Sequence, residues 1–180
     1  MLELLRRDYF RFMLKKHSSK FSQEIPTEGL EKQEQPFSAW RDAKTGVPLV
    51  DALINELNTT GYITNQGRQI LASYLIKYLD VNWVFGAAFF KEKLIDYSPA
   101  SNLGNWISLL EEATGTPAKG FDIIKKAQES DPQGEYVRRW VPVLASIPGG
   151  LIHQPWKLSA QELKQYGIDD LSVYAALSVA

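Results

Sequence analysis

Residues 48–78, "PLVDALINELNTTGYITNQGRQILASYLIKY", decide the fold class. Apolar residues recur in them at spacings of three and four, which is the period of an α-helix with one buried face. Pro48 stands where the first turn of a helix tolerates proline, and Gly61 ends the pattern. Asn65 is then expected to cap a second helix, whose apolar stripe starts at Ile70. The stretch therefore predicts consecutive helices joined by a short turn.

Residues 2–16 continue the helical period on the N-terminal side, whereas residues 17–36 do not. The segment 17–36 is polar and contains Pro and Gly, so we expect a long surface connection there. The helix predicted for 2–16 has an apolar face and a basic face. The basic face could contact phosphates, although a face of this kind is more often simply solvated. The basic residues are Arg7, Arg11 and Lys15, and the apolar ones are Leu2, Leu5, Tyr9, Phe12 and Met13.

The C-terminal side also has the pattern of helices. Those expected cover about 82–95, 103–113 and 134–145. Pro142 must kink or end the last of them. Ser159 and Glu162 form a capping-box pair at the start of a final short helix. Because no hairpin dipeptide is flanked by alternating apolar residues, we predict an all-α fold, with residues 1–180 as one domain.

The composition argues against several classes of protein. Twenty Lys and Arg against 21 Asp and Glu leave no net field that would attract nucleic acid or a membrane. The chain has no Cys for a thiolate site and no apolar run long enough to span a membrane. The first residues lack the order of a signal peptide, so we expect a cytoplasmic protein. Glycine-rich phosphate loops and a serine nucleophile elbow are missing, and His17 and His153 lack metal-ligand spacing.

Residues 95–106, "IDYSPASNLGNW", do not fit a plain core element. They place an Asp, a Pro, two Asn, a Gly and a Trp directly after an apolar helical run. For Trp106 taken alone, packing in the core is the ordinary role of a large aromatic ring. The residues themselves leave the purpose of so many polar groups unexplained.

Several motifs stand in a recognisable order along the chain. They are W-R-x-x-x-T-G-x-P-L-V-D from Trp40, T-G-x-x-x-N-x-x-R from Thr60, W-x-x-G-x-x-x-F from Trp83, the 95–106 stretch, D-P-x-G-E-Y-V-x-x-W from Asp131 and H-x-P-W from His153. This order resembles the FAD-binding helical domain of the photolyase/cryptochrome family, with cryptochrome-DASH as the nearest branch. The resemblance covers about residues 3–156, and separate blocks in one order make it specific.

The resemblance implies FAD as the cofactor and a place for it beside residues 95–106. Asn102 matches the residue that faces flavin N5, and an amide there can donate or accept a hydrogen bond. Asp96 and Arg68 match an acidic–basic pair beside the ring. Asn65 matches a further pocket position, and Tyr62 stands where the family has a Trp.

The resemblance also implies a path for electrons. Trp106 and Trp83 match the first two rings of the chain that feeds electrons to the photoexcited flavin. Packing in the core remains the alternative for both rings. The third, outer ring of the family falls near Leu30, so we expect light-driven reduction of FAD to be slower and less complete than with three rings.

Other departures from the family concern DNA and phosphate. The family's phosphate-binding loop and its N-terminal antenna domain correspond to positions upstream of residue 1, so we expect FAD to be held weakly. Arg6 and Ser108 stand where two aromatic rings would hold a flipped pyrimidine dimer, and Gln66 replaces an Arg that grips DNA phosphate. Glu3 matches the carboxylate that contacts the dimer. We therefore expect no repair of duplex DNA and weak or no binding of nucleic acid.

Three functions remain open at this point. The first is an FAD-binding, cryptochrome-like module with a photoreceptor or redox role. The second is a subunit that completes its flavin site with a partner chain. The third is a helical scaffold without cofactor, which ranks last because the pocket residues are retained. We expect a homo-oligomer or a partner chain, since a chain lacking the family's other parts exposes apolar surface. If the chain is an enzyme, the resemblance implies a light-dependent lyase of the photolyase type.

Overall fold

The computed structural model describes residues 2–16, 30–115, 122–168 and 174. All regular secondary structure in these residues is helical, which confirms the predicted all-α fold. The chain divides into two compact units: the first comprises residues 1–37 and 64–118, and the second comprises 38–63 and 119–180. The single domain over 1–180 stays a prediction. None of the helices in the described ranges is long and apolar enough to cross a membrane.

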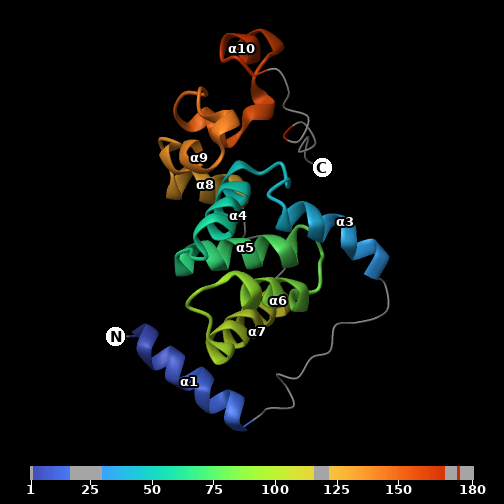
Figure 1. Cartoon of the computed structure of the whole chain (residues 1–180), viewed down its shortest axis with the longest axis vertical. Coiled ribbons are helices and arrows are strands. Elements are labelled where there is room, and N and C mark those ends of the chain that lie inside the picture. The colour runs from blue at the N-terminus through green and yellow to red at the C-terminus, as the bar shows by residue number, and fades with distance from the viewer. Residues whose placement is uncertain (1, 17–29, 116–121, 169–173, 175–180) are drawn as a thin grey trace. The chain divides into compact units, whose positions relative to one another are not determined.

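The first unit is organised around helix α7 (Pro99–Gly115). This helix packs against α1 (Leu2–Lys16), α5 (Asn65–Lys77) and α6 (Trp83–Lys93). Figure 1 shows α5, α6 and α7 lying side by side. Helix α3 (Leu30–Arg41) begins in the same unit, where the side-chain oxygen of Gln33 accepts a hydrogen bond of 2.9 Å from the backbone N–H of Asn82.

Glycines permit the close helix contacts of the first unit. A Cβ atom at Gly104 of α7 would lie 2.3 Å from the ring of Phe10 on α1. A Cβ atom at Gly86 of α6 would lie 2.3 Å from the ring of Trp106 on α7. Each glycine therefore forms a notch that a neighbouring aromatic ring fills, and any side chain there would displace that ring.

The second unit packs α4 (Pro48–Thr60) against α9 (Glu135–Trp140). It also contains α8 (Ile123–Ser130), α10 (Ala160–Gln165) and 3-10 turns at Pro142–Leu144, Gly149–His153 and Pro155–Lys157. One buried cluster of this unit consists of aliphatic side chains with one tyrosine: Ala52, Val137, Val141, Leu144, Ile147, Ile152, Ile168 and Tyr174.

Several predicted helix ends are confirmed. Pro48 occupies the first turn of α4, and Gly61 ends that helix in a left-handed conformation with φ of 70°. Ser159 and Glu162 form the predicted capping box of α10. Helix α9 ends at Trp140, directly before the turn that Pro142 begins.

Other boundaries differ from the prediction. Thr64 rather than Asn65 caps α5, because the Thr64 hydroxyl accepts from the N–H of Gly67 at 3.1 Å. Helix α3 begins at Leu30, inside the segment predicted as a connection. Helix α7 begins at Pro99 rather than near 103, since proline suits the first turn of a helix. Asn102 and Trp106 therefore lie on a helix and not on a turn.

Helix α1 forms as predicted, but it buries a different face. Leu5, Tyr9 and Phe12, predicted to be the buried stripe, are 65%, 56% and 72% exposed. Phe10 is buried instead, in the notch at Gly104. The predicted buried face of α1 was wrong because the notch in α7, which is distant in the sequence, determines which ring of α1 is buried.

Candidate functional site

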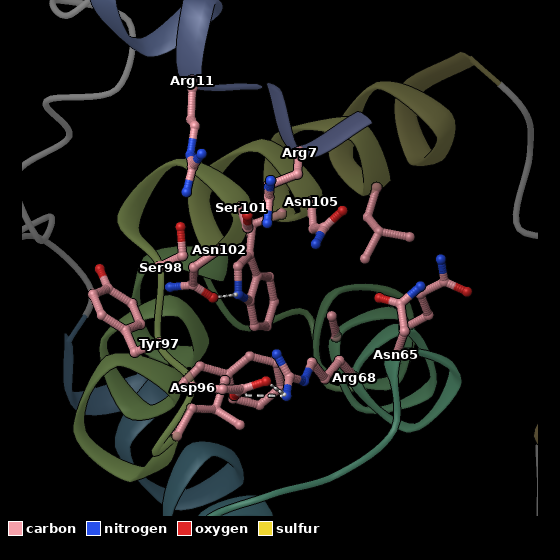
Figure 2. Close-up of a pocket in the computed structure, with 16 residues that line it drawn as sticks. Arg7, Arg11, Asn65, Arg68, Asp96, Tyr97, Ser98, Ser101, Asn102 and Asn105 are labelled. Atoms are coloured by element: carbon pink, nitrogen blue, oxygen red, sulfur yellow. Dashed lines mark hydrogen bonds and ion pairs between the residues drawn. The ribbon is translucent and has the colours of Figure 1, made fainter. Parts of the chain in front are cut away.

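A pocket of about 340 Å³ lies within the first unit, lined by α1, α5, α6, α7 and the loop between α6 and α7. Figure 2 shows that its labelled polar side chains come from several of these elements and point toward a common space. Apolar walls are formed by Phe90, Trp106 and Leu109 among others. An apolar pocket with a few convergent polar groups is the usual form of a small-molecule site.

Asn102 is a buried polar residue of this lining. Its Nδ2 donates to the carbonyl oxygen of Ala87 on α6 at 3.0 Å, and its Oδ1 accepts from Nε1 of Trp106 at 3.1 Å. Asn102 and Trp106 are four residues apart on α7, so their side chains lie one above the other on the same face. The two bonds fix the amide in one orientation.

Trp106 is held on its other sides by apolar contacts. Its ring fills the notch at Gly86, and the ring of Phe90 lies 5.3 Å away between centroids, tilted by 56°. The ring is almost fully buried, yet one part of it lines the pocket. Trp106 therefore presents a fixed edge to whatever fills this space.

Arg68 and Asp96 form an ion pair in the pocket wall. One terminal nitrogen of Arg68 lies 2.8 Å from each carboxylate oxygen of Asp96. The two side chains are 23% and 46% exposed, so the pair sits at the rim rather than in the interior. An ion pair this exposed contributes about 1 kcal/mol or less to stability.

Arg7 and Arg11 bring two further guanidinium groups to the pocket. Figure 2 shows both side chains directed from α1 toward the polar residues of α7. Asp8 lies 3.5 Å from each of them, so one carboxylate is shared between two cations. This wall of the pocket is therefore positive and suits an anionic group.

The structure brings together most of the predicted site residues. Asn65, Arg68, Asp96, Asn102 and Trp106 all line the pocket. Tyr62 and Trp83 do not line it. Tyr62 belongs to the second unit and is half-exposed. Trp83 is buried at the start of α6.

Sequence reasoning missed part of the lining. For Arg7 and Arg11 the sequence leaves a phosphate contact and a solvated face both open, because a polar face toward a pocket has the same pattern as a polar face toward water. Both side chains line the pocket and are about half-exposed. Ser101, Asn105 and Leu109 also line the pocket from α7. Asn105 lies three residues from Asn102, and Leu109 lies three residues from Trp106. That spacing predicts both as lining residues once residues 99–115 are taken as one helix, whereas Ser101 has no such spacing to either residue.

The positions that argued against repair are described only in part. The side chains of Glu3, Arg6 and Leu30, and all of His17, lie outside the described parts of the chain. Ser108 is described: its hydroxyl donates to the carbonyl oxygen of Gly104 at 2.9 Å. Gln66 is exposed on α5.

The chain matches, over residues 1–180, the family model described as the FAD binding domain of DNA photolyase. It belongs to this family. FAD is accordingly the cofactor of the domain, as the motifs predicted. The family assignment also confirms the resemblance to photolyases and cryptochromes.

Several relatives within this family are cryptochromes of the DASH branch. The chain is 43% identical to "Cryptochrome DASH" of Gloeobacter violaceus over 175 residues, which cover 93% of this chain and 35% of the relative. It is 45% identical to "Cryptochrome DASH" of Synechocystis sp., with the same coverage of 93% and 35%. The chain thus spans about a third of the length of the curated relatives it matches.

Solved structures agree with the sequence matches. The crystal structure of Synechocystis sp. PCC6803 cryptochrome superimposes with a TM-score of 0.81 at 43% identity, covering 93% of this chain and 36% of that one. An archaeal photolyase from Sulfolobus tokodaii, solved with two FAD molecules, gives a TM-score of 0.77 at 32% identity, covering 87% and 38%. The helical fold of the family is therefore shared by this chain.

Proposed function

We propose that this chain is an FAD-binding module of the cryptochrome type, with a photoreceptor or redox role and no repair of duplex DNA of its own. The observation that carries the proposal is the joint position of Asn102 and Trp106. Both line one pocket, and they are bonded to each other there. A polar amide beside an oxidisable ring suits a redox-active heterocycle.

The lining of the pocket fits the ring end of FAD. Its volume of about 340 Å³ lies near the lower end of the range of about 300–1,000 Å³ for ligand sites, which suits a ring system better than a whole dinucleotide. Phe90 and Trp106 supply apolar surface, while Asn65 and Asn102 supply donors and acceptors for the polar edge. When bound, the flavin supplies an electron acceptor that light activates.

The positive wall fits the phosphates of the same cofactor. Arg7 and Arg11 carry two charges against the single carboxylate of Asp8, so an anion is favoured on this side of the pocket. We assign the diphosphate end of FAD to this wall. Arg68 is balanced by Asp96 and is assigned to the ring end instead.

The electron-donating role rests on Trp106 and then Trp83. Both rings are buried in the first unit, and Trp83 begins the helix that carries Ala87 and Phe90. We expect Trp106→Phe to abolish most light-driven reduction of bound FAD. Unchanged photoreduction would show that the two rings only pack.

The absence of repair rests on the residues expected to hold a flipped base. Ser108 has no ring, and its hydroxyl is occupied by the backbone of its own helix. Irradiating a duplex that contains pyrimidine dimers, with protein in catalytic amounts, should leave the dimers in place. Light-dependent loss of dimers would contradict this part of the proposal.

A second candidate is a site completed by another chain or another copy. The exposed side chains of Leu5, Tyr9 and Phe12 favour it, because contiguous apolar surface is usually covered by association. Sedimentation of the purified chain, with and without FAD, separates this candidate from a monomer that binds FAD alone.

The decisive experiment is titration of the chain with FAD. Saturable binding is expected, and Asn102→Leu and Arg68→Ala should each weaken it about tenfold or more, as loss of a bond worth about 1.4 kcal/mol would. Arg41→Ala is a matched control, because Arg41 pairs with Asp42 at 2.9 Å in the second unit and does not line the pocket. Equal weakening by the control, or no binding at all, would overturn the proposal.

A further inference from the structure

We propose that Asn102 is a positioning residue for Trp106, and that it keeps the indole proton on Nε1 when the ring gives up an electron. The inference rests on the proposed redox function. It goes further by assigning to the amide oxygen of Asn102 a role in the oxidation of Trp106.

The orientation of the amide follows from its two partners. The carbonyl of Ala87 can only accept, so the Asn102 atom 3.0 Å from it must be the nitrogen. The indole of Trp106 can only donate, so the atom 3.1 Å from its Nε1 must be the oxygen. A flipped amide would place two donors together and two acceptors together. The indole N–H is therefore always directed at an amide oxygen.

The ring cannot turn to find another partner. The notch at Gly86 and the ring of Phe90 enclose Trp106, and the indole is nearly fully buried. Rotation would break the bond to Asn102 and drive the ring into neighbouring atoms. The amide retains one N–H and one lone pair beyond these two bonds, and these are free to serve a ligand.

The identity of this acceptor matters once Trp106 is oxidised. Removing one electron leaves a positive charge on the ring and makes the indole N–H strongly acidic. An amide oxygen is too weak a base to take that proton, so the proton stays on Nε1. The charge then remains on the ring until an electron from a neighbouring aromatic side chain cancels it.

A carboxylate in the same place would act differently. The proton would pass from Nε1 to the carboxylate oxygen, leaving a neutral carboxyl and a neutral ring radical. A neutral radical needs both an electron and a proton to be restored, so the charge would no longer move on. Asn102 therefore keeps oxidation of Trp106 a step that transfers an electron alone.

The charges around this position come from three sides of the pocket. Arg7 and Arg11 line it from α1, and Arg68 lines it from α5 together with Asp96 from the following loop. Helix α6 contributes only Phe90 to the lining. The nearby cations favour the ionised form of a carboxyl at position 102, while burial favours the neutral form. Asn102→Asp should thus titrate, whereas the amide cannot.

The hydrogen bond is tested first on protein without flavin. Trp106→Phe assigns the Trp106 signal among the indole N–H resonances in a nitrogen–proton correlation spectrum. Hydrogen exchange of this signal should become about tenfold or more faster in Asn102→Leu, the change expected for a bond worth about 1.4 kcal/mol, and should stay slow in Asn102→Asp. Unchanged exchange in Asn102→Leu would overturn the positioning role.

Flash oxidation tests whether the proton stays on Nε1 of the oxidised Trp106. A ruthenium polypyridyl complex serves as the oxidant, so that the result does not depend on flavin. The Trp106→Phe difference spectrum isolates the signal of the Trp106 radical. The wild type should give the protonated radical from pH 5 to 9, and Asn102→Asp should change to the deprotonated form as the pH rises. A deprotonated radical in the wild type, or a variant without pH dependence, would overturn the proposal. Failure of FAD to bind would sink the proposed function and leave this result standing.

Discussion

Buried polar side chains of the two units differ in what they bond to. In the second unit, the buried carboxylates accept hydrogen bonds from the backbone around them. In the first unit, the amide of Asn102 retains a donor and an acceptor for a ligand in the pocket. Oδ1 of Asp131 accepts from the N–H of Tyr136 at 3.2 Å, and Oδ2 accepts from that of Val137 at 3.0 Å. These are among the first N–H groups of α9, so Asp131 caps that helix from outside it. The backbone oxygen of Asp131 accepts from Nε2–H of the buried His153 at 2.6 Å.

Asp51 shows the same arrangement at the start of α4. Its carboxylate accepts from the N–H and the hydroxyl of Thr45, at 2.9 and 2.7 Å, and from the N–H of Gly46 at 3.3 Å. Tyr174 adds a side-chain hydrogen bond. The carboxylate thereby fixes the loop that leads into α4.

The comparison separates two kinds of motif that look alike in the sequence. Asp51 and Asp131 belong to family motifs as clearly as Asn102 does, yet both are fully engaged in holding loops of the second unit. Family membership therefore indicates which residues matter without indicating which of them touch a ligand.

The largest effect on stability is expected from a substitution at Asp131. Replacing it by Ala removes the acceptors of Tyr136 and Val137, and stability should fall by about 2–5 kcal/mol because a buried N–H without a partner costs about 1–3 kcal/mol. Urea denaturation measures the loss. Asp122→Ala removes an exposed cap of α8 and should cost only about 1 kcal/mol. Equal losses in both variants would show that burial of the Asp131 contacts does not matter.

A second test uses pH. Burial, opposed by the hydrogen bonds from Thr45, Gly46 and Tyr174, raises the pKa of Asp51 from 3.8 to about 6. The folded chain then holds this proton more tightly than the unfolded chain does. The contribution is fully present below about pH 4 and is lost as the pH rises through about 6. It amounts to about 3 kcal/mol for a shift of this size.

The pH effect is measured as the difference in unfolding free energy between the wild type and Asp51→Asn from pH 4 to 7. Subtracting the variant is necessary because other carboxyls act in the opposite sense. The side chain of Arg41 lowers the pKa of Asp42, and hydrogen bonds from Ser159 lower that of Glu162. A difference that is flat or rises with pH would mean that Asp51 titrates normally in the folded chain.

A third test concerns the notch at Gly86 in the first unit, which the ring of Trp106 fills. Gly86→Ala places a methyl group 2.3 Å from the ring of Trp106 and 2.6 Å from Leu75, so one of them must move. We expect a loss of about 2 kcal/mol and weaker binding of FAD, because overpacking a tight contact typically costs about 1–3 kcal/mol. Gly150→Ala in the second unit meets its nearest atom at 3.5 Å and should change neither quantity. Full FAD affinity in Gly86→Ala would separate the packing of Trp106 from the site.

The smallest effect is expected on the exposed face of α1. Leu5→Gln and Phe12→Gln should each change the unfolding free energy by less than about 0.5 kcal/mol, because neither side chain is buried. Chemical denaturation at two protein concentrations makes the measurement. A loss above about 1 kcal/mol that grows on dilution would indicate a face covered by another copy.

The sequence predicted well where one residue determines the local backbone. Gly61 and the pair Ser159 and Glu162 gave correct helix ends, because a left-handed residue and a capping box act within a few positions of the chain. The family motifs identified the residues around the pocket for a related reason. Each motif carries its own local chemistry, and their order along the chain was sufficient to name the fold.

Prediction failed where the outcome depended on a distant partner. The start of α7 was missed because its face toward the pocket is polar, and a polar face carries no hydrophobic period. For the same reason the sequence could not decide between a phosphate contact and a solvated face for Arg7 and Arg11. On α1, the sequence predicts that the apolar stripe with Leu5 and Phe12 is buried, whereas the structure buries Phe10. No residue near position 10 in the sequence indicates the notch at Gly104 that receives this ring.

A helix held by few buried side chains separates from its neighbours more often than one held by a full apolar stripe. Among the described side chains of α1, only Phe10 is buried, and it fills the notch at Gly104, while Arg7 and Arg11 of the same helix line the pocket. If the ring left the notch, both guanidinium groups would leave the pocket wall with it. The frequency of this separation would then limit how fast a ligand enters and how long it resides. A tighter contact between Phe10 and Gly104 would slow both the entry and the release of the ligand. The rate of ligand exchange would then change more than the affinity, which depends on the ratio of the two rates.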